Sequence, residues 1–411
     1  MTNREWFARA KYGLFIHFGL YALLGGEYRG RRTHNIAEWI MHDFDIPVSE
    51  YEQLALQFDP VNFDADRIAR QAKGWGMEYI VITAKHHEGF ALWDSEASDY
   101  NCAKASPCHR DLIREMAEAC RKYGLQLGLY YSQAQDWHHP GGFSYRRDNS
   151  HKDYQRYLDE KCMPQLRELL TGYGPLCLVW FDTPMDTTPA QSKAMADLVH
   201  ALQPDCLISG RIGNDLGDYL TLADNLIPRL PIDRLWEVPA TTNETWGYNR
   251  YDDHWKSPQE IIKILVRICA QGGNYLLNIG PDGSGAFPQE AEQILDEVSR
   301  YVSANREAIV GTRAMKLYPY EPTWGDLTMK DYHLYVHIYK PQKIIGLMNI
   351  RAHVKRVTIL ETGQALPFEC LDACEGNGML EFILPEDYHD RGYYVVDIEM
   401  NDKEATFEPI M

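Results

Sequence analysis

The sequence predicts an α/β protein, a (β/α)8-like barrel over residues 1–312 followed by a C-terminal antiparallel β-sandwich over residues 313–411. Two observations predict the barrel. Short apolar runs each end at a polar residue, as buried parallel strands do where their carboxyl ends meet at a working face. Segments of helical period separate these runs. After about residue 312 the apolar period changes from 3.6 to 2, which predicts the sandwich.

The run that defines the barrel pattern begins at Tyr79, where an apolar, β-branched segment stops abruptly at Lys85, His86, His87 and Glu88. The other predicted strands of the barrel cover residues 13–18, 125–131, 176–181, 206–209 and 272–280. The predicted helices cover residues 1–12, 64–76, 110–123, 151–171, 190–202, 258–271 and 288–304. Only six or seven strands are evident, and a segment with four prolines (228, 231, 239 and 258) is predicted to be irregular.

Two long polar connections, at 20–50 and 133–150, have the length of functional loops rather than of simple turns. In the C-terminal part, alternating apolar residues predict the strands 332–339, 343–348, 354–360, 379–384 and 393–398. The residues of this part that carry chemistry lie in alternating strands without a clustered motif. We therefore expect the sandwich to support the barrel rather than to supply catalytic groups.

The composition limits the partners of the protein. The 411 residues include 41 basic and 59 acidic side chains, which gives a net charge of −18 and a pI near 5.3. Such a surface is a poor partner for nucleic acids and for anionic membranes. The nine cysteines form no CxxC pair, and no apolar stretch approaches the roughly 18 residues of a membrane span. The sequence predicts a cytoplasmic protein and leaves assembly into homo-oligomers open.

Two carboxylates follow tryptophan-containing apolar segments. Asp182 ends the run Leu178–Phe181, and Glu237 follows Trp236 in an apolar context that would raise its pKa. Each has a plainer interpretation, a helix N-cap for Asp182 and an exposed side chain for Glu237, and Arg211 could equally form a structural ion pair. Two carboxylates on a barrel rim, beside aromatic residues and neutral histidines, suggest glycoside hydrolysis. No recurring set of metal ligands is present, so we expect no metal and no cofactor.

A series of motifs, in order along about 300 residues, resembles family 29 α-L-fucosidases. The motifs are Lys11–Gly19, Glu38-Trp39, Thr83–Phe90, Gly128–Ser132, Val179–Asp182, Trp236-Glu237, Trp246–Tyr248 and Gly272–Pro281. The resemblance implies a retaining exo-α-L-fucosidase that releases terminal fucose from fucosylated oligosaccharides, with Asp182 as the nucleophile. It implies that the fucose-binding residues are His17, Glu38, Trp39, His86, His87, Tyr130, Arg211 and Trp246.

The sequence departs from that family at the acid/base. Many members carry a Thr-Pro-Glu motif where this chain has Ala223, so another carboxyl must protonate the leaving oxygen. We predict Glu237 for this role, with Asp224 and Glu244 as the alternatives. Two other classes stay open from the sequence: a metal-dependent barrel hydrolase that uses the histidines as ligands, and a non-catalytic fucose-binding relative.

Overall fold

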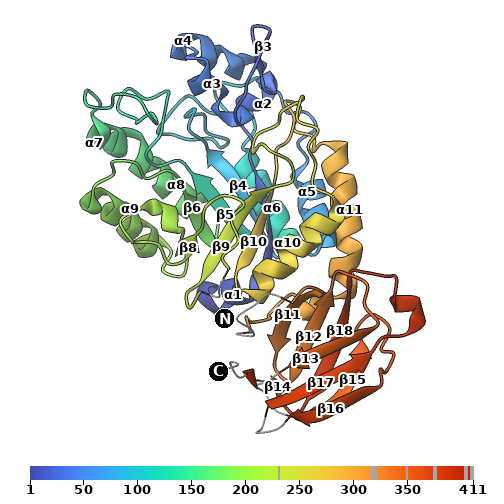
Figure 1. The fold of residues 1–411 in the computed structure, drawn as a ribbon. Coiled ribbons are helices and arrows are strands. Elements are labelled where there is room, and N and C mark those ends of the chain that lie inside the picture. Colours follow the sequence, from blue (N-terminus) through green and yellow to red (C-terminus); the bar gives the residue numbers. More distant parts are fainter. Residues whose placement is uncertain (230–231, 316–321, 349, 374–376, 402–405, 408–411) are drawn as a thin grey trace.

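The structure is a computed structural model, and it describes residues 1–229, 232–315, 322–348, 350–373, 377–401 and 406–407 (Figure 1). The last four residues of the predicted sandwich, 408–411, lie outside the described residues. A search of the described residues for a helix with the length and apolarity to cross a membrane finds none.

Eight parallel strands form the barrel that the sequence predicts. In sheet order they are β7 (Leu207–Ile208), β6 (Leu178–Phe181), β5 (Gln126–Tyr131), β4 (Tyr79–Lys85), β1 (Tyr12–Ile16), β10 (Asn274–Ile279), β9 (Trp236–Thr241) and β8 (Leu220–Thr221). The two outer strands meet, because Ser209 pairs with Tyr219 in parallel and the Asp218 N–H donates to the Ile208 carbonyl at 2.8 Å. The sheet is therefore closed, and successive strands along the chain are neighbours around it.

Helices cover the outside of the barrel (Figure 1). The helices that follow strands are α5 (Ala65–Gly74), α6 (Leu112–Tyr123), α8 (Met163–Gly172), α9 (Pro189–Leu202), α10 (Pro258–Ala270) and α11 (Gln289–Ala304). A short helix α7 (Tyr154–Tyr157) and a π-helical turn (Leu158–Cys162) precede α8. In the described residues between β7 and β9, the connections contain a 3-10 turn (Gly210–Ile212) and the short strand β8, but no α-helix.

Local sequence sets the ends of these helices. The Asp64 and Asp111 side chains cap α5 and α6 by accepting from the backbone N–H three residues on, and Ser257 caps α10 in the same way. Gly124 ends α6 at φ 66°, in the left-handed region that glycine enters without strain. Six of the seven predicted helices are single α-helices in the structure, whereas the predicted helix 151–171 divides into α7, the π-helical turn and α8.

In the barrel, the strands that the sequence did not reveal are β8 and β9. Strand β8 has two residues, which is too few for a pattern of apolar residues to show. Strand β9 contains Pro239, whose missing N–H argued against a regular strand. The Pro239 carbonyl accepts from the Asn225 N–H at 3.0 Å, beyond the last residue of β8. The proline therefore faces a side where the neighbouring strand has already ended, and no ladder hydrogen bond is lost.

The two ends of the barrel are closed differently (Figure 1). At the amino end of the strands, α1 (Asn3–Ala10) packs Trp6 against Tyr79 and Phe7 against Tyr219, as predicted for a helix that closes one end. At the carboxyl end, the first long loop folds into small elements. These are α2 (Tyr21–Leu24), β2 (Glu27–Tyr28), β3 (Arg31–Arg32), α3 (Ile40–Asp43), α4 (Val48–Tyr51) and 3-10 turns at Ala37–Trp39 and Glu52–Gln57.

The C-terminal part consists of antiparallel sheets with an apolar core of their own. One sheet contains β11 (Gly325–Lys330), β12 (His333–Ile338), β18 (Tyr394–Met400) and β15 (Val354–Ile359), and a second contains β13 (Ile344–Met348), β17 (Asn377–Ile383) and β16 (Phe368–Ala373). A separate pair is formed by β14 (Ile350–Arg351) and β19 (Thr406–Phe407). All five strands predicted here are present, and the sequence missed β11, β14, β16 and β19.

Buried polar contacts join this part to the barrel. The His337 ring lies between the Tyr301 hydroxyl of α11, at 2.8 Å, and the Thr328 hydroxyl, at 3.0 Å. Thr328 in turn donates to the Ala308 carbonyl at 2.7 Å, and Arg267 of α10 forms an ion pair with Asp326 at 2.6 Å. The outer surface of α10 and α11 is therefore an internal interface of the molecule.

We expect a chain truncated at Thr312 to aggregate, since removal of the sheets exposes the apolar and polar groups of this interface to water. Size-exclusion chromatography of the truncated and full-length proteins would measure the effect. A monodisperse truncated protein with full activity would contradict the supporting role that we predict for the C-terminal part.

Candidate active site

A pocket of about 100 Å³ opens at the carboxyl end of the barrel strands. Most of its lining residues come from the ends of barrel strands and from the first long loop, residues 20–57, which covers the carboxyl end of the barrel. They are Phe15, His17, Ile36, Glu38, Trp39, His86, His87, Trp180, Asp182, Thr183, Arg211, Asp224 and Trp246. The pocket thus gathers nearly all the residues that the sequence analysis singled out.

Asp182 directly follows β6, and every polar atom of its carboxylate is engaged. Oδ1 accepts from Arg211 at 3.0 Å and from the Thr183 N–H at 2.9 Å, while Oδ2 accepts from the Tyr130 hydroxyl at 2.9 Å. Burial alone would raise the pKa of Asp182, but the Arg211 charge and the hydrogen bonds from Arg211 and Tyr130 together lower it. The carboxylate is therefore ionised and fixed in orientation, as a nucleophile requires.

The residue after Asp182 holds a strained backbone. Thr183 has φ 44°, which is a genuine outlier for a β-branched residue. The Thr183 N–H reaches back to Asp182, and the Thr183 hydroxyl accepts from the Gln135 side chain at 3.0 Å. The Asp182 N–H is also held, by the Gln133 side chain at 2.8 Å. Strain of this kind persists only where the surroundings impose it, and here it orients the carboxylate.

His17 and His87 present neutral rings to the pocket. Burial lowers the pKa of His17 to about 4 and that of His87 to about 3, so both are uncharged at neutral pH. Nδ1 of His17 lies 2.7 Å from Oδ1 of Asn278, whose Nδ2 donates to a backbone carbonyl at 2.7 Å. Since Oδ1 can only accept, we assign the proton of His17 to Nδ1, which leaves Nε2 as an acceptor.

The same reasoning applies to His87. Its Nδ1 lies 2.7 Å from the Ser132 hydroxyl, and this hydroxyl donates its own proton to the Gln135 carbonyl at 2.8 Å. We therefore assign the proton of His87 to Nδ1 as well. Nε2 of His87 and Nδ1 of His86 have no hydrogen-bond partner within the described residues, although both atoms are buried. Such atoms are free to bond the hydroxyl groups of a ligand.

Glu38 and the aromatic residues complete the walls. Burial raises the pKa of Glu38 to about 8, although the Gly247 N–H, which donates at 2.8 Å, opposes this shift. Glu38 is therefore largely protonated at neutral pH and can donate a hydrogen bond. The ring centre of Trp39 lies 5.3 Å from that of His87, and the ring centre of Trp246 lies 5.1 Å from that of His17. An apolar wall opposite a row of polar groups suits a sugar ring, which has both kinds of surface.

Arg211 connects Asp182 with a second carboxylate. One guanidinium nitrogen binds Asp182, and the other donates to Asp224 and to the Leu222 carbonyl at 3.1 Å. The Asp182 side chain is 11% exposed, whereas that of Asp224 is 42% exposed and lies at the mouth of the pocket. One carboxylate therefore lies inside the pocket and the other faces the solvent at its entrance.

Glu237 does not line the pocket. It is the second residue of β9 and pairs in register with Asn274, the first residue of β10, so it lies near the amino end of the strands. Oε2 accepts from the Tyr79 hydroxyl at 2.6 Å, and Oε1 accepts from the Trp180 indole at 2.9 Å. Burial raises its pKa to about 7, as its apolar context predicts. Its hydrogen bonds hold Trp180, which does line the pocket.

Two further predicted residues, Tyr130 and Glu244, do not line the pocket. Tyr130 is fully buried behind the pocket, where its hydroxyl donates to Asp182 and its ring stacks on that of His86 at 5.4 Å. Glu244 lines a different pocket, with Asp252 and His254. Among the described residues these three offer ligand atoms within 4.8 Å of one another, close enough to hold a metal ion. They are outside the catalytic pocket, and Asp252 already accepts from the backbone N–H groups of Glu244 and His254.

The residues that orient the pocket from behind were not predicted from the sequence. Gln133 holds the Asp182 backbone, Ser132 fixes the tautomer of His87, and Asn278 fixes that of His17. Ser132 and Asn278 do lie inside the quoted motifs, at or beside the carboxyl end of β5 and β10. A polar residue inside a buried strand was the signal that could have identified Asn278.

A buried cluster of charged side chains, Lys85, Asp136 and Lys161, lies next to the His86-His87 segment. Oδ2 of Asp136 lies 3.1 Å from the Lys85 ammonium and 2.8 Å from that of Lys161, and all three side chains are almost fully buried. Burial lowers the pKa of Lys85 to about 8, although Asp136 opposes the shift. Burial would raise the pKa of Asp136, but the two lysine charges overcome this effect and lower it.

We expect Asp136→Ala to lower the free energy of unfolding by about 3 to 5 kcal/mol, because it leaves two buried ammonium groups unpaired. Urea unfolding at neutral pH measures this loss. Because the folded pKa of Asp136 is depressed, its contribution is present above the pKa of the unfolded state and is lost as the pH falls. The variant should therefore lose less stability than the wild type on acidification. The control is Asp159→Ala, an exposed change; equal stability of both variants would contradict the prediction.

A closed (β/α) barrel with an ionised carboxylate in a sugar-sized pocket, and a second carboxylate at the mouth, defines a glycoside hydrolase. The chain belongs to the α-L-fucosidase family, since residues 1–307 match the family model described as Alpha-L-fucosidase. Its activity is accordingly that of an α-L-fucosidase, which releases fucose. This excludes the non-catalytic relative that the sequence left open.

Individual relatives agree with this assignment. The α-L-fucosidase of Dictyostelium discoideum is 30% identical over 339 residues, which are 75% of this chain and 71% of that protein. The crystal structure of the α-L-fucosidase from a Vibrio species superposes with a TM-score of 0.91 at 32% identity, over 98% of this chain and 73% of that chain. The Lactobacillus casei enzyme AlfC, solved with α-L-fucose product, has a TM-score of 0.71 at 42% identity, over 74% of this chain and 99% of that chain.

Proposed function

We propose that the protein is a retaining exo-α-L-fucosidase in which Asp182 is the nucleophile. In the first step Asp182 attacks the anomeric carbon and forms a β-linked fucosyl ester, while an acid protonates the departing oxygen. In the second step the residue that acted as the acid removes a proton from a water molecule. The water attacks the anomeric carbon from the face opposite the ester, which releases fucose and restores Asp182. The small pocket supports an exo mode of action, because a volume of about 100 Å³ leaves room for little more than one sugar unit.

The observation that carries this proposal is the Arg211 bridge between two carboxylates. Two carboxylates bound to the same guanidinium lie close together, as the separation of about 5 to 5.5 Å in retaining glycosidases requires.

Of the carboxylates that the sequence offered as acid/base, the geometry favours Asp224 over Glu237. The acid must reach the oxygen that joins fucose to the rest of the glycan, and this oxygen faces the mouth of the pocket. Asp224 lies there, whereas both Glu237 oxygens are occupied deep in the barrel. Glu38 also lines the pocket and is protonated, but its carboxyl is buried and held by Gly247, which suits contact with the sugar itself.

We further propose that Nε2 of His17 and of His87 accept hydrogen bonds from fucose hydroxyl groups and that protonated Glu38 donates one. The rings of His17 and His87 and the carboxyl of Glu38 are each fixed by a hydrogen bond to a residue outside the pocket, so little conformational entropy is lost on binding. His86, Trp39 and Trp246 complete the contact surface.

Hydrolysis of a nitrophenyl α-L-fucoside, followed by proton NMR, tests the stereochemical part of the proposal. The first product should be α-L-fucose, which then equilibrates with the β-anomer. Initial release of β-L-fucose would mean an inverting mechanism and would exclude Asp182 as a covalent nucleophile.

We also propose that the protein acts in the cytoplasm. Six of the eight cysteines whose side chains the structure describes are buried, and the sequence contains no CxxC pair. Cysteines that are buried as small apolar side chains are typical of proteins in a reducing compartment. Recovery of the native enzyme from the culture medium or the periplasm, rather than from the cytoplasmic fraction, would contradict this.

A further inference from the structure

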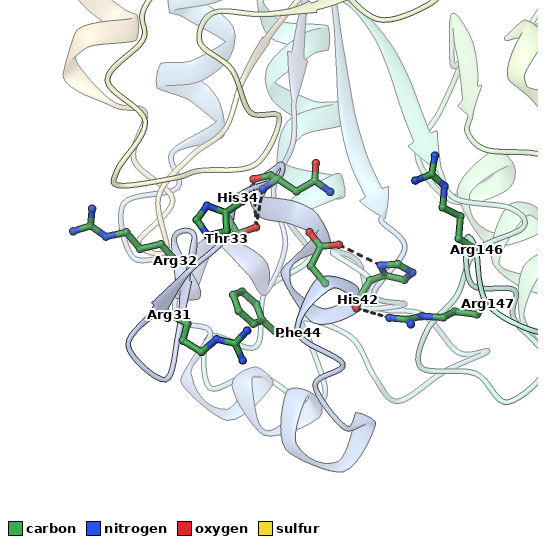
Figure 2. A pocket seen from close by; sticks show the side chains of 10 residues that line it. Arg31, Arg32, Thr33, His34, His42, Phe44, Arg146 and Arg147 are labelled. Atoms are coloured by element: carbon green, nitrogen blue, oxygen red, sulfur yellow. Dashed lines mark hydrogen bonds and ion pairs between the residues drawn. The ribbon is translucent and has the colours of Figure 1, made fainter.

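A second, larger cavity lies beside the catalytic pocket and is rich in arginine (Figure 2). We call it the basic groove. It has a volume of about 660 Å³, and residues 31–35, 42–44 and 146–147 form its walls. Its charged side chains are Arg31, Arg32, Arg146, Arg147 and one acid, Asp43. In a protein with a net charge of −18, four arginines around a single cavity are a local reversal of the surface charge.

Three of these arginines have no carboxylate partner within the described residues. Their guanidinium groups instead lie over aromatic rings: Arg31 is 4.8 Å from the Phe44 ring centre, Arg32 is 3.7 Å from that of Tyr251, and Arg146 is 5.0 Å from that of Tyr145. A stacked guanidinium keeps the N–H groups on its edge free, and the ring limits its motion. These are favourable conditions for binding an anion from solution.

The acids near the groove each contact a neighbouring side chain. Arg147 binds Asp45 at 2.5 Å and donates to the His42 carbonyl at 3.1 Å. Asp43 lies 3.3 Å from Nδ1 of His42. Figure 2 shows Arg31 beside Phe44, Arg147 beside His42, and Arg32 and Arg146 at opposite ends of the view. The free positive charge of the groove therefore comes from Arg31, Arg32 and Arg146.

The groove adjoins the catalytic pocket through a shared wall. Trp39 lines the catalytic pocket, and its ring lies 5.2 Å from the ring of His42 and 5.6 Å from that of Tyr145. Ile36 also lines the catalytic pocket, and Arg32 is four residues earlier in the chain, at most about 14 Å away. A glycan whose terminal fucose occupies the catalytic pocket can thus leave it past Trp39 and Ile36 and extend over the groove.

Resting on the proposed exo-fucosidase function, we propose that the basic groove binds the part of the substrate that follows fucose, and that this part carries a negative charge. The substrate class is a fucosylated glycan with a carboxylate, sulfate or phosphate group on a sugar near the fucose. The overall charge of the protein repels such a molecule, and the groove supplies the local attraction that offsets the repulsion.

A matched set of fucosyl disaccharides tests this proposal. The neutral member is fucose linked to glucose, and the charged members carry glucuronate, an O-sulfate or an O-phosphate in place of the same primary alcohol. We expect kcat/KM to be about 5- to 30-fold higher for at least one charged member at low salt, which is the effect of two or three exposed charge contacts. At about 1 M salt, where the Debye length is about 3 Å, the preference should fall to about twofold or less. The member with the highest ratio identifies the anion.

The variant Arg31→Gln/Arg32→Gln/Arg146→Gln should lose the preference and keep the wild-type kcat/KM for the neutral disaccharide. Arg29→Gln is the matched control, since Arg29 lies in the same loop but is already bound by Glu50 at 2.8 Å. It should keep the preference. Thermal unfolding of each variant shows that the changes leave the fold intact.

The proposal would be overturned if no charged disaccharide has a higher kcat/KM than the neutral one, or if the preference for a charged disaccharide survives in the triple variant. If the enzyme cleaves none of the disaccharides, the same ratio is measured from their competitive inhibition of nitrophenyl α-L-fucoside hydrolysis. Hydrolysis of that neutral aryl fucoside tests the catalytic proposal alone, so failure of the exo-fucosidase function and failure of the groove are distinguishable.

Discussion

Asp182→Ala should lower kcat for every fucoside by about 10⁴- to 10⁶-fold, the loss expected when a catalytic nucleophile is removed. The substitution takes away the group that forms the fucosyl ester, and it also leaves Arg211 and Tyr130 without the carboxylate that they hold. Azide should partly restore turnover of an aryl α-L-fucoside by entering the vacated space. Because azide then attacks from the nucleophile's face, the product should be the β-fucosyl azide, which NMR identifies.

Asp186→Ala is the control for this result, since Asp186 is an exposed carboxylate four residues further along the same loop. Its kcat should equal that of the wild type. An Asp182→Ala enzyme with more than about one hundredth of the wild-type kcat, or an azide product of α configuration, would assign the nucleophile to another residue.

Asp224→Ala should have the next largest effect. We expect about 10²- to 10⁴-fold slower hydrolysis of oligosaccharides, whose leaving groups need a proton. Aryl fucosides with good leaving groups should lose much less in the first step, so the fucosyl-enzyme should accumulate. Azide should speed its breakdown and give the α-fucosyl azide, the opposite configuration from that of Asp182→Ala.

Glu237→Gln separates the two carboxyls that compete for this role. The amide keeps an acceptor for one of the two donors, Tyr79 or Trp180, and we expect hydrolysis of oligosaccharides within about tenfold of wild type together with a lower melting temperature. If instead Glu237→Gln shows the leaving-group dependence and azide rescue described for Asp224→Ala, the acid/base is Glu237 and it must reach the pocket by a movement of Trp180.

The sequence was sufficient for the parts of the barrel that depend on uninterrupted burial. β4 has all seven residues buried, so its apolar run had an unambiguous start and end, and His86 and His87 could be placed at the rim. β8 could not be predicted because two residues carry no period, and β9 was hidden because Pro239 is acceptable only where its neighbour has ended. That condition is a property of the folded sheet.

The prediction of Glu237 shows a different limit. Trp236 and Glu237 are flanked by apolar residues on both sides, and such a context raises the pKa of a carboxyl at either end of a strand. Local sequence therefore indicated a perturbed carboxyl and did not indicate its depth. Register with Asn274 places it at the amino end, while the chemistry gathers at the carboxyl end. The residues that orient the pocket, such as Ser132, were missed because their partners are distant in sequence.

The described residues between β7 and β9 include no α-helix. This difference from the rest of the barrel affects which sequence changes the fold tolerates near each carboxylate. Asp182 follows a strand backed by helices on both sides, so altering its setting would require α8 and α9 to repack. Asp224 belongs to a connection that is not packed beneath a helix of its own, and residues there can be exchanged or shifted at small cost in stability. The two carboxylates that we propose for catalysis therefore have unequal freedom to vary: the proposed nucleophile is held by the architecture of the barrel, while the proposed acid/base can move along its loop and adapt to new leaving groups.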